Sequence, residues 1–561
     1  MPQVKDVAMA RTTATTNRQT PTKRLVLREA VDSISKGLAA RSKSSTSSSR
    51  PPSRLTSLSS IGSSEPRQEP LEPPVPPSKV VLVPVLPVLP RPTPSAVDER
   101  SSLPVGGRLI HYWQDWRDMG ASRKIVRWLR FGYPLPFHKN VRGLNITPPL
   151  KLFPPPELVT HYPEPAKQAQ LLAMLDELVQ KKAIREIDHN VPVHFSRVFL
   201  VPKMNGKQRL VVDLSILNQW LLCPHFKMDH AQVIRGSLVP LMWATSIDLS
   251  DAYLHIPMHP ENWKYLVFQV GDKRYQFMVL PFGLNTAPRV FSEVMKALKR
   301  WGRALGLVLF QYLDDWLQLN LDMALLQHQT LNLLRQAATL GLIVNHEKSE
   351  VIPQQKIVFL GDMLDFQSGM IFPTKIRFQA ICAKIELITN RPTAQFYMVH
   401  SLLGLLAATE KIVPYGRLHF RVLQTFCRFH MHRKVRRFHK VVVSSSVLKD
   451  LLWWSDPIHV FRGLPMTPPV PDFQIQTDAS TTGWGINFRN QIISGTWNQQ
   501  DQLLHINLLE MKTVLIAFER LQNHLQDRCV LFLIDNQTVV SYLQKQGDTR
   551  SVALMSLMTN D

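Results

Sequence analysis

Residues 311–317 have the sequence Gln-Tyr-Leu-Asp-Asp-Trp-Leu, in which two adjacent acids stand between apolar runs. The alternation of apolar and polar residues on both sides predicts a β-hairpin with Asp314 and Asp315 at its turn. Two like charges side by side cost free energy unless a cation lies nearby. A divalent-metal site at a hairpin tip and an ordinary polar turn both fit this stretch, because Asp is also a common turn residue.

A third acid lies upstream, at the end of another predicted strand. The short strand-like segment 245–247 ends at Asp248, which precedes Asp314 by 66 residues. That separation leaves room for a hairpin and a helix between two neighbouring strands, and residues 275–305 have the pattern of a strand, a Pro-Gly turn and a helix. The three carboxylates are therefore expected on one face of an α+β sheet.

A basic hairpin precedes these acids. Residues 198–202 and 209–213 are strand-like and flank the turn 203–207, which contains two lysines. A cationic tip is usually only a solvated turn. It gains meaning if a triphosphate has to be held near the acids.

The chain as a whole is strongly basic, with 561 residues and a formal net charge of +23. This charge predicts a polyanionic partner, either nucleic acid or an anionic membrane surface. No apolar run approaches the ~18 residues of a membrane span, and the N-terminus has no signal-peptide core, so nucleic acid is favoured. The four cysteines are far apart in the sequence, which fits a reducing compartment. We expect a cytoplasmic or nuclear protein that is not secreted.

Composition and periodicity divide the chain into five parts. We predict a disordered Ser- and Pro-rich basic tail at 1–104 and an aromatic, partly helical segment with an extended connector at 105–165. An α+β region at 166–365, a basic helical region at 366–470 and a second α/β region at 471–561 follow. The basic helical region contains a cluster of Arg, Lys and His between Arg421 and Lys440, for which contact with a phosphate backbone and a solvated surface are the alternatives.

The last region holds a second set of acids. Asp478 ends a predicted strand, Glu510 lies in the first turn of a helix predicted over 508–525, and Asp535 follows the apolar strand 530–534. An uncompensated charge at the end of a buried element is costly.

Together these motifs resemble a reverse transcriptase followed by a ribonuclease H domain. The polymerase resemblance covers about 166–361 and rests on six motifs in a fixed order, namely LVVDLSILN, SIDLSDAY, LPFGLNTAP, YLDD, GLIVNHEKS and VFLG. More closely, the chain resembles the DIRS group of retrotransposons, which use a tyrosine recombinase, through GGRL, FKM, DLSDAYLHIP, LLWW and TDAS…GWG…HINLLE. The expected fold is a right-hand polymerase of fingers, palm and thumb followed by a ribonuclease H-like domain.

The resemblance implies a two-metal nucleotidyl transfer, for which carboxylates must converge from different strands. Asp248, Asp314 and Asp315 are the expected ligands, and the carbonyl of Leu249 could add another. All-oxygen ligation favours Mg²⁺, with Mn²⁺ as a substitute. By the same resemblance, Lys203 and Arg209 would bind the triphosphate, and Tyr253 would be the gate against the ribose 2′-hydroxyl. Phe282 and Gly283 would line the nucleotide pocket, and Lys348 would donate a proton to the leaving pyrophosphate.

In the ribonuclease H-like part, Asp478, Glu510 and Asp535 match three acids of the family, which again hold two metal ions. A fourth acid, and the strand that precedes it, find no match before Asp561. We therefore expect an incomplete domain with impaired cleavage of RNA–DNA hybrids, and an outer sheet edge without a partner strand.

The leading expectation is an RNA-directed DNA polymerase of a retroelement. Its partners would be an RNA template, a DNA primer, the RNA–DNA hybrid and deoxynucleoside triphosphates, with no membrane partner; the sequence does not predict an oligomeric state. The alternative is a decayed or co-opted copy that binds nucleic acid without catalysis. The complete set of polymerase acids favours the first.

Overall fold

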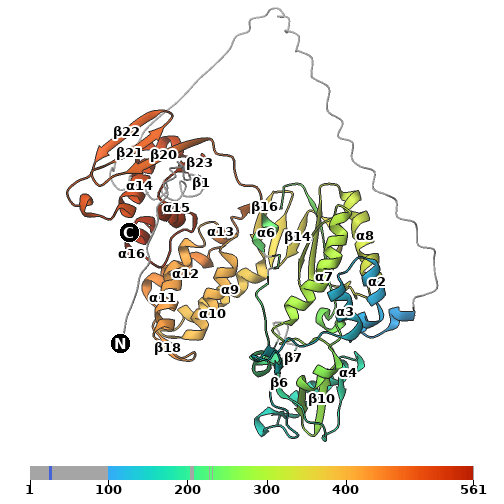
Figure 1. The fold of residues 1–561 in the computed structure, drawn as a ribbon. Coiled ribbons are helices and arrows are strands. Elements are labelled where there is room, and N and C mark those ends of the chain that lie inside the picture. Colours follow the sequence, from blue (N-terminus) through green and yellow to red (C-terminus); the bar gives the residue numbers. More distant parts are fainter. Residues whose placement is uncertain (1–23, 28–98, 203–207, 227, 230, 560–561) are drawn as a thin grey trace, which may run out of the picture. The chain divides into compact units, whose positions relative to one another are not determined.

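The structure is a computed structural model that describes residues 24–27, 99–202, 208–226, 228–229 and 231–559 (Figure 1). The described chain forms two compact units, one within residues 61–371 and one that joins strand β1 (Arg24–Leu27) to Phe372–Asp561. No helix among the described residues is long and apolar enough to cross a lipid bilayer. Most of the predicted tail, and the turn 203–207 with Lys203, lie outside the described residues.

A four-stranded antiparallel sheet is the centre of the first unit. Its order is β11 (Val308–Tyr312), β12 (Asp315–Asn320), β8 (Trp243–Asp248) and β13 (Glu350–Gln354). The apolar residues of these strands are buried because helices α7 (Ala287–Ala304) and α8 (Met323–Thr339) pack against the sheet. The predicted hairpin, the strand before Asp248 and the helix after the Pro-Gly turn are thereby confirmed, whereas β13 was not predicted.

A second sheet contains the basic hairpin. Its strand order is β5 (Ile184–Glu186), β10 (Lys273–Phe277), β9 (Val267–Val270), β6 (Phe195–Pro202) and β7 (Gln208–Asp213). The short strand β4 (Val159–Thr160) also pairs with β9. Helix α4 (Pro165–Gln180) buries Leu171 and Leu175 against the common core, as its apolar spacing predicts.

The aromatic segment before these sheets packs on the same core. The described part of this region begins with the 3₁₀ helix η1 (Glu99–Ser102), which lies within the last residues of the predicted tail 1–104, and Arg100 forms an ion pair with Asp115 at 2.8 Å. Helices α2 (Trp113–Asp118) and α3 (Arg123–Phe131) follow, and the predicted connector includes a short hairpin of β2 (His138–Lys139) and β3 (Asn145–Ile146). The fully buried Trp116 donates its indole N–H to the carbonyl of Leu340 at 2.9 Å.

The second unit begins with a group of helices. They are α9 (Lys375–Thr389), α10 (Phe396–Thr409), α11 (Arg421–His432), α12 (Ser445–Ser455) and α13 (Pro457–Val460). Arg421, which the sequence placed in a cluster for phosphate contact, is instead buried. It donates to the carbonyls of Lys545 at 2.5 Å and Gln546 at 3.3 Å, so its guanidinium caps the end of α15 (Gln537–Gln544).

The rest of this unit is a five-stranded sheet in the order β1, β23 (Val530–Leu533), β20 (Phe473–Ala479), β21 (Gly483–Phe488) and β22 (Gln491–Thr496). Strand β23 runs parallel to β20, and helices α14 (Ile506–Leu525) and α16 (Val552–Thr559) contribute to the core beneath. The expectation of an unpaired outer edge is wrong, because β1 pairs antiparallel with β23.

Candidate active sites

The first acid site is built by two adjacent strands and the turn beside them. Asp248 is the last residue of β8, and Asp315 is the first residue of β12 and its direct cross-strand partner. The hairpin turn consists of Leu313, which has φ 56°, and Asp314. The prediction of Asp-Asp at the turn is thus half right, because Asp315 already belongs to the strand. The N–H of Leu249 donates to the carbonyl of Asp314 at 3.1 Å, which fixes the turn against the end of β8.

The electrostatics of this site favour a bound cation. Burial, followed by the charges of Asp314 and Asp248, raises the pKa of Asp315 to about 6. Burial and the charge of Asp248 also raise the pKa of Asp314, although the cations Lys348 and Arg209 act in the opposite direction. These carboxyl groups therefore ionise less readily than ordinary ones, and a nearby cation would favour their ionised form.

Two of the predicted cations lie near these acids. The Nζ of Lys348 is 3.6 Å from Oδ1 of Asp248, although the Lys348 side chain is 67% exposed. Arg209 on β7 lies close enough to Asp314 to lower the pKa of that acid. The structure therefore brings Lys348 and Arg209 to the acid site, while Lys203 lies outside the described residues.

The predicted pocket residues form an aromatic group beside the acids. The ring of Tyr253 packs against Phe282 at 4.8 Å and Phe291 at 5.6 Å between centroids. Tyr253 belongs to the 3₁₀ helix η4 (Ala252–His255). Burial, with a contribution from the charge of Asp314, raises the pKa of Tyr253 to about 12, so its hydroxyl is neutral at ordinary pH.

Gly283 stands at a close approach between two backbone segments. It has φ 97°, and a Cβ on it would lie 2.6 Å from the carbonyl oxygen of Val212. No other residue fits such a position without a shift of the backbone. The side chain of Asn218 holds the same loop, because its Nδ2 donates to Gly283 O and its Oδ1 accepts from Asn285 N, both at 2.9 Å.

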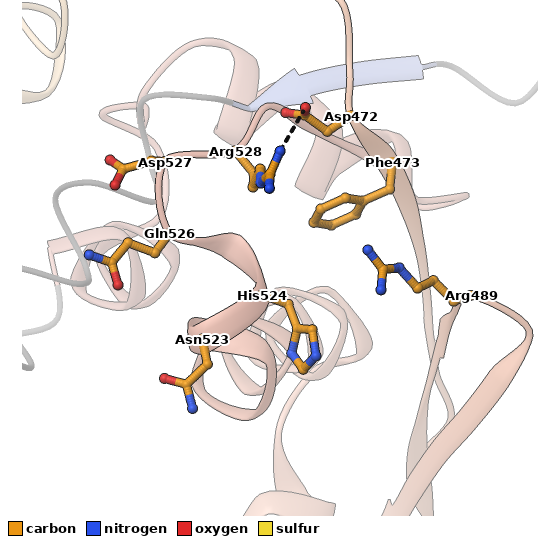
Figure 2. A pocket seen from close by; sticks show the side chains of 8 residues that line it. All are labelled: Asp472, Phe473, Arg489, Asn523, His524, Gln526, Asp527 and Arg528. Carbon is orange, nitrogen blue, oxygen red and sulfur yellow. Dashed lines mark ion pairs between the residues drawn. The ribbon is translucent and has the colours of Figure 1, made fainter. Parts of the chain in front are cut away.

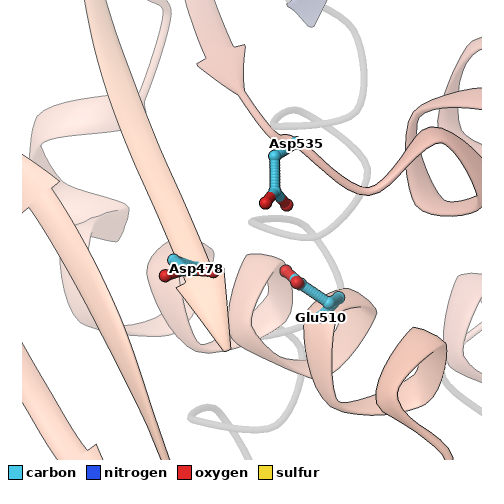
Figure 3. A group of neighbouring side chains, drawn as sticks. All are labelled: Asp478, Glu510 and Asp535. Carbon is cyan, nitrogen blue, oxygen red and sulfur yellow. The ribbon is translucent and has the colours of Figure 1, made fainter. Parts of the chain in front are cut away.

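The second acid site lies at one edge of the five-stranded sheet (Figure 3). Asp478 is near the end of β20 and Asp535 follows β23, so these two parallel strands deliver both acids to the same edge. Glu510 reaches them from α14, which begins two residues earlier than predicted, so that Glu510 lies in its second turn. One carboxylate oxygen of each acid lies within 4.8 Å of one from each of the others.

This second site also suits a divalent cation. Glu510 is 4% exposed, and its Oε2 has no hydrogen-bond partner in the described structure. Burial, followed by the charges of Asp535 and Asp478, raises the pKa of Glu510 to about 7. An orphaned, buried carboxylate oxygen beside two more acids is a donor set that hard cations prefer. Among the described residues this is the only group of three or more acidic, His or Cys side chains that converges so closely. The carboxylate oxygens of Asp248, Asp314 and Asp315 lie farther apart.

A separate cavity lies at the opposite end of β20 (Figure 2). Its volume is about 510 Å³, and Phe473, Arg489, His524 and Arg528 are among the residues that line it. Arg528 is engaged by Asp472 at 3.6 Å, and the Arg489 guanidinium lies against Phe473 and Phe488. Phe473 begins the strand on which Asp478 lies near the far end, so this cavity is not part of the acid site.

Sequence reasoning missed several residues that support the first site. Asn218, Asp229 and Ser349 each make long-range contacts there, and the Ser349 hydroxyl accepts the N–H of Asp248 at 3.0 Å. One signal was available for Asp229, because Lys299 stands on the apolar face of α7, where a lysine needs a buried counter-charge.

Comparison with known proteins agrees with the geometry of the first site. Residues 201–364 match the family model described as reverse transcriptase (RNA-dependent DNA polymerase). The chain is 26% identical over 268 residues to a retrovirus-related Pol polyprotein from the transposon opus of Drosophila melanogaster, covering 46% of this chain and 26% of the relative. It is 22% identical over 407 residues to a putative enzymatic polyprotein of Cassava vein mosaic virus, covering 68% of this chain and 59% of the relative.

Among solved structures, the chain is similar to the foamy viral protease-reverse transcriptase in complex with RNA/DNA hybrid, with 15% identity, a TM-score of 0.49, and coverage of 80% of this chain and 61% of that chain. The chain spans between about a quarter and three fifths of the two polyproteins above. We conclude that residues 201–364 form a reverse transcriptase domain, similar to the one in Pol polyproteins of retrotransposons and retroviruses.

Proposed function

We propose that this chain acts as an RNA-directed DNA polymerase of a retroelement and extends a primer on an RNA or DNA template. One observation carries the proposal: Asp315 lies opposite Asp248, with Asp314 in the adjoining turn, inside the segment that matches the reverse transcriptase model. Such a reaction is a phosphoryl transfer, in which catalysis comes mainly from positioning and from neutralisation of charge.

Asp248, Asp314 and Asp315 are the proposed holders of the metal ions, and the Leu249 carbonyl is a further candidate ligand. The raised pKa values of Asp314 and Asp315 support this role, because both acids lack sufficient positive charge nearby. Bound Mg²⁺ or Mn²⁺ would polarise the phosphate and lower the pKa of the attacking hydroxyl. The all-oxygen donor set favours Mg²⁺.

The incoming deoxynucleoside triphosphate is proposed to lie between the basic hairpin and the aromatic group. Arg209 and Lys203 would bind the triphosphate, and Phe282 and Gly283 would line the pocket. Tyr253 would exclude a ribose 2′-hydroxyl, and the support for this role is its ring, which two phenylalanines hold near Asp314. Lys348, 3.6 Å from Asp248, would donate a proton to the leaving pyrophosphate.

The RNA template, the DNA primer and their hybrid are the proposed macromolecular partners. The helical part at 366–470 is the proposed thumb and connection, after fingers and palm at 166–365. Its exposed cations after α11, which are Arg433, Lys434, Arg436, Arg437 and Lys440, are candidates for contact with the phosphate backbone. The basic tail at 1–104 and the segment 105–165 complete this assignment.

We further propose a ribonuclease H-like domain at 471–561 with metal-dependent but impaired hydrolysis. The convergence of Asp478, Glu510 and Asp535 supports hydrolysis, whereas no fourth acid joins these three among the described residues, which supports impairment. Degradation of an RNA–DNA hybrid by the parent chain and by Asp478→Asn tests this point. Strong cleavage that depends on Asp478 would refute the impairment.

For the element itself we propose the DIRS group. Its support is the set of motifs that includes GGRL, FKM and LLWW. A tyrosine recombinase encoded beside this chain would support the assignment, and an integrase of the retroviral type would contradict it.

The decisive experiment is primer extension on an RNA template with Mg²⁺. The parent chain should extend the primer, and Asp314→Asn should reduce extension by at least about a thousandfold while it leaves binding of the hybrid within a few-fold. If the parent binds the hybrid but does not extend the primer, the chain is a binding protein that has lost catalysis.

A further inference from the structure

Strand β11 lies at the edge of the four-stranded sheet and pairs only with β12 among the described strands. N–H groups on its outer side therefore receive no partner from the sheet, and such groups need one when they are sheltered from water. The N–H of Gln311 finds this partner in Asp229, whose Oδ2 accepts it at 3.1 Å. Gln311 precedes Asp314 by three residues and pairs with Trp316, so this bond lies close to the hairpin turn that contains Asp314.

The same carboxylate oxygen is also bound to α7. It accepts a hydrogen bond from the Nζ of Lys299, and the two side chains are only 22% and 11% exposed. An ammonium group in such surroundings is stable only with a nearby opposite charge. The ion pair therefore fixes Asp229 in place, and with it the acceptor for Gln311.

Helix α7 contributes to the nucleotide pocket as well. Its Phe291 packs against the ring of Tyr253 at 5.6 Å, and Tyr253 in turn packs on Phe282. Asp229 thus joins, through one oxygen atom, the strand that leads to Asp314 and the helix that supports the pocket.

We propose that Asp229 is a positioning residue for polymerase catalysis. It sets the position of the Asp314 hairpin relative to α7, and hence the distance between the metal-binding carboxylates and the bound nucleotide. This inference rests on the proposed polymerase function. A purely structural ion pair is the competing explanation, and it predicts that loss of activity simply follows loss of stability.

The two explanations differ in what the hydrogen bond to Gln311 contributes. Without its acceptor, the edge of β11 can move while the rest of the sheet stays paired. A displacement of about 1 Å at a catalytic group can cost on the order of a hundredfold in rate. We therefore expect kcat to fall by about 10- to 100-fold, with the KM for the nucleotide changed by less than about threefold.

A matched pair of double variants separates the acceptor from the charge. Asp229→Asn with Lys299→Met and Asp229→Ala with Lys299→Met both remove the ion pair, but only the first keeps a side-chain oxygen for the Gln311 N–H. The Asn variant should keep kcat within about threefold of the parent, and the Ala variant should show the 10- to 100-fold loss. The Ala variant should also need more Mg²⁺ for half-maximal rate, a readout that a merely structural role would not move.

Asp362→Asn is the control for stability alone. Asp362 forms another buried ion pair in the same unit, with Arg235 at 2.5 Å. This variant should lower the melting temperature and leave kcat and the Mg²⁺ requirement unchanged. Equal kcat in the two double variants, or an equal loss of kcat in Asp362→Asn, would overturn the proposal.

A further variant covers the case in which the Ala double variant does not fold. Asp229→Glu keeps the charge opposite Lys299 but moves the acceptor by one methylene, so its kcat should fall, and parental kcat would count against the proposal. The parent chain is the reference throughout. If the parent itself does not extend a primer, the proposed function fails, whereas a parent that extends normally confines any failure to Asp229.

Discussion

Asp315 lies directly opposite Asp248 in the antiparallel register of β12 and β8. Side chains in such positions are cross-strand neighbours, and like charges there destabilise the pair. Burial, with the charges of Asp314 and Asp248, accordingly raises the pKa of Asp315 to about 6. The pairing therefore couples the protonation of Asp315 to the binding of a cation.

The Mg²⁺ requirement for primer extension should depend on pH. A carboxylate binds Mg²⁺ only when it is deprotonated, so protons compete with the metal below the raised pKa of about 6. The Mg²⁺ concentration for half-maximal rate should fall as the pH rises from about 5 to 7 and level off above. Asp315→Asn should require more Mg²⁺ at every pH and show a flatter dependence.

Extension rates measured over a grid of Mg²⁺ concentration and pH would check this prediction. Asp365→Asn is the control, because Asp365 forms an ion pair with Lys356 at 3.0 Å. Burial raises the pKa of Asp365, but hydrogen bonds from Lys356 and Ser368 outweigh it, so the pKa is lowered overall. Its profile should match the parent. An unchanged profile in Asp315→Asn would show that Asp315 does not take part in metal binding.

Tyr253→Ala should weaken the discrimination against ribonucleotides. The Tyr253 ring is held by Phe282 and Phe291, so its removal leaves space beside the proposed ribose position. The ratio of kcat/KM for deoxynucleotides to that for ribonucleotides should fall by about 10- to 100-fold, the range that an apolar pocket can supply against one added hydroxyl. Tyr253→Phe keeps the ring and should keep the ratio. Equal discrimination in the Ala variant would remove Tyr253 from this role.

Local sequence patterns predicted the strands and helices that carry the acids, because burial on one face imposes a period that the sequence displays. Asp478, Glu510 and Asp535 were instead predicted from the resemblance to ribonuclease H, because Glu510 lies within a helix and has no distinctive local pattern. Contacts between distant residues leave no such pattern. Arg421 resembles its basic neighbours in sequence, yet it alone among the cations of α11 is buried, and it binds carbonyls more than a hundred residues away.

The pairing of β1 with β23 and the bond between Asp229 and Gln311 illustrate the same limit. Each contact joins segments that are far apart along the chain, so no local sequence pattern predicts it. The sequence also could not predict how closely the acids within each group converge. The six acids look alike in sequence, yet only Asp478, Glu510 and Asp535 have carboxylate oxygens within 4.8 Å of one another.

Gly341→Ala should destabilise the unit that contains the reverse transcriptase domain. Gly341 has φ 78°, and a Cβ there would lie 2.4 Å from the ring of Tyr112. Overpacking of this kind costs about 1–3 kcal/mol, and a left-handed conformation adds about 1–2 kcal/mol for a residue with a side chain. Urea denaturation followed by tryptophan fluorescence would measure the loss.

Gly306→Ala separates these two costs. Gly306 has φ 76°, but a Cβ on it would meet no atom within 4 Å in the part of the chain that the structure describes. Only the conformational cost of about 1–2 kcal/mol is then expected. Equal losses in the two variants would mean that Tyr112 does not pack against Gly341 as described.

Glu510→Gln should stabilise the metal-free chain at high pH. The folded-state pKa of about 7 exceeds the ordinary value of 4.5, so the folded chain holds this proton more tightly than the unfolded chain does. The stability that the protonated Glu510 contributes is therefore complete below pH 4.5 and is lost as the pH rises through about 7. Gln carries no charge and avoids this loss.

The difference in melting temperature between Glu510→Gln and the parent, measured in EDTA, should accordingly be small near pH 4.5 and favour the variant increasingly up to about pH 8. Mg²⁺ should reverse the order at about pH 8, because it binds the ionised parent site and so stabilises the folded state by mass action. A difference that does not vary with pH would mean that Glu510 is not buried beside Asp478 and Asp535 in an unneutralised cluster.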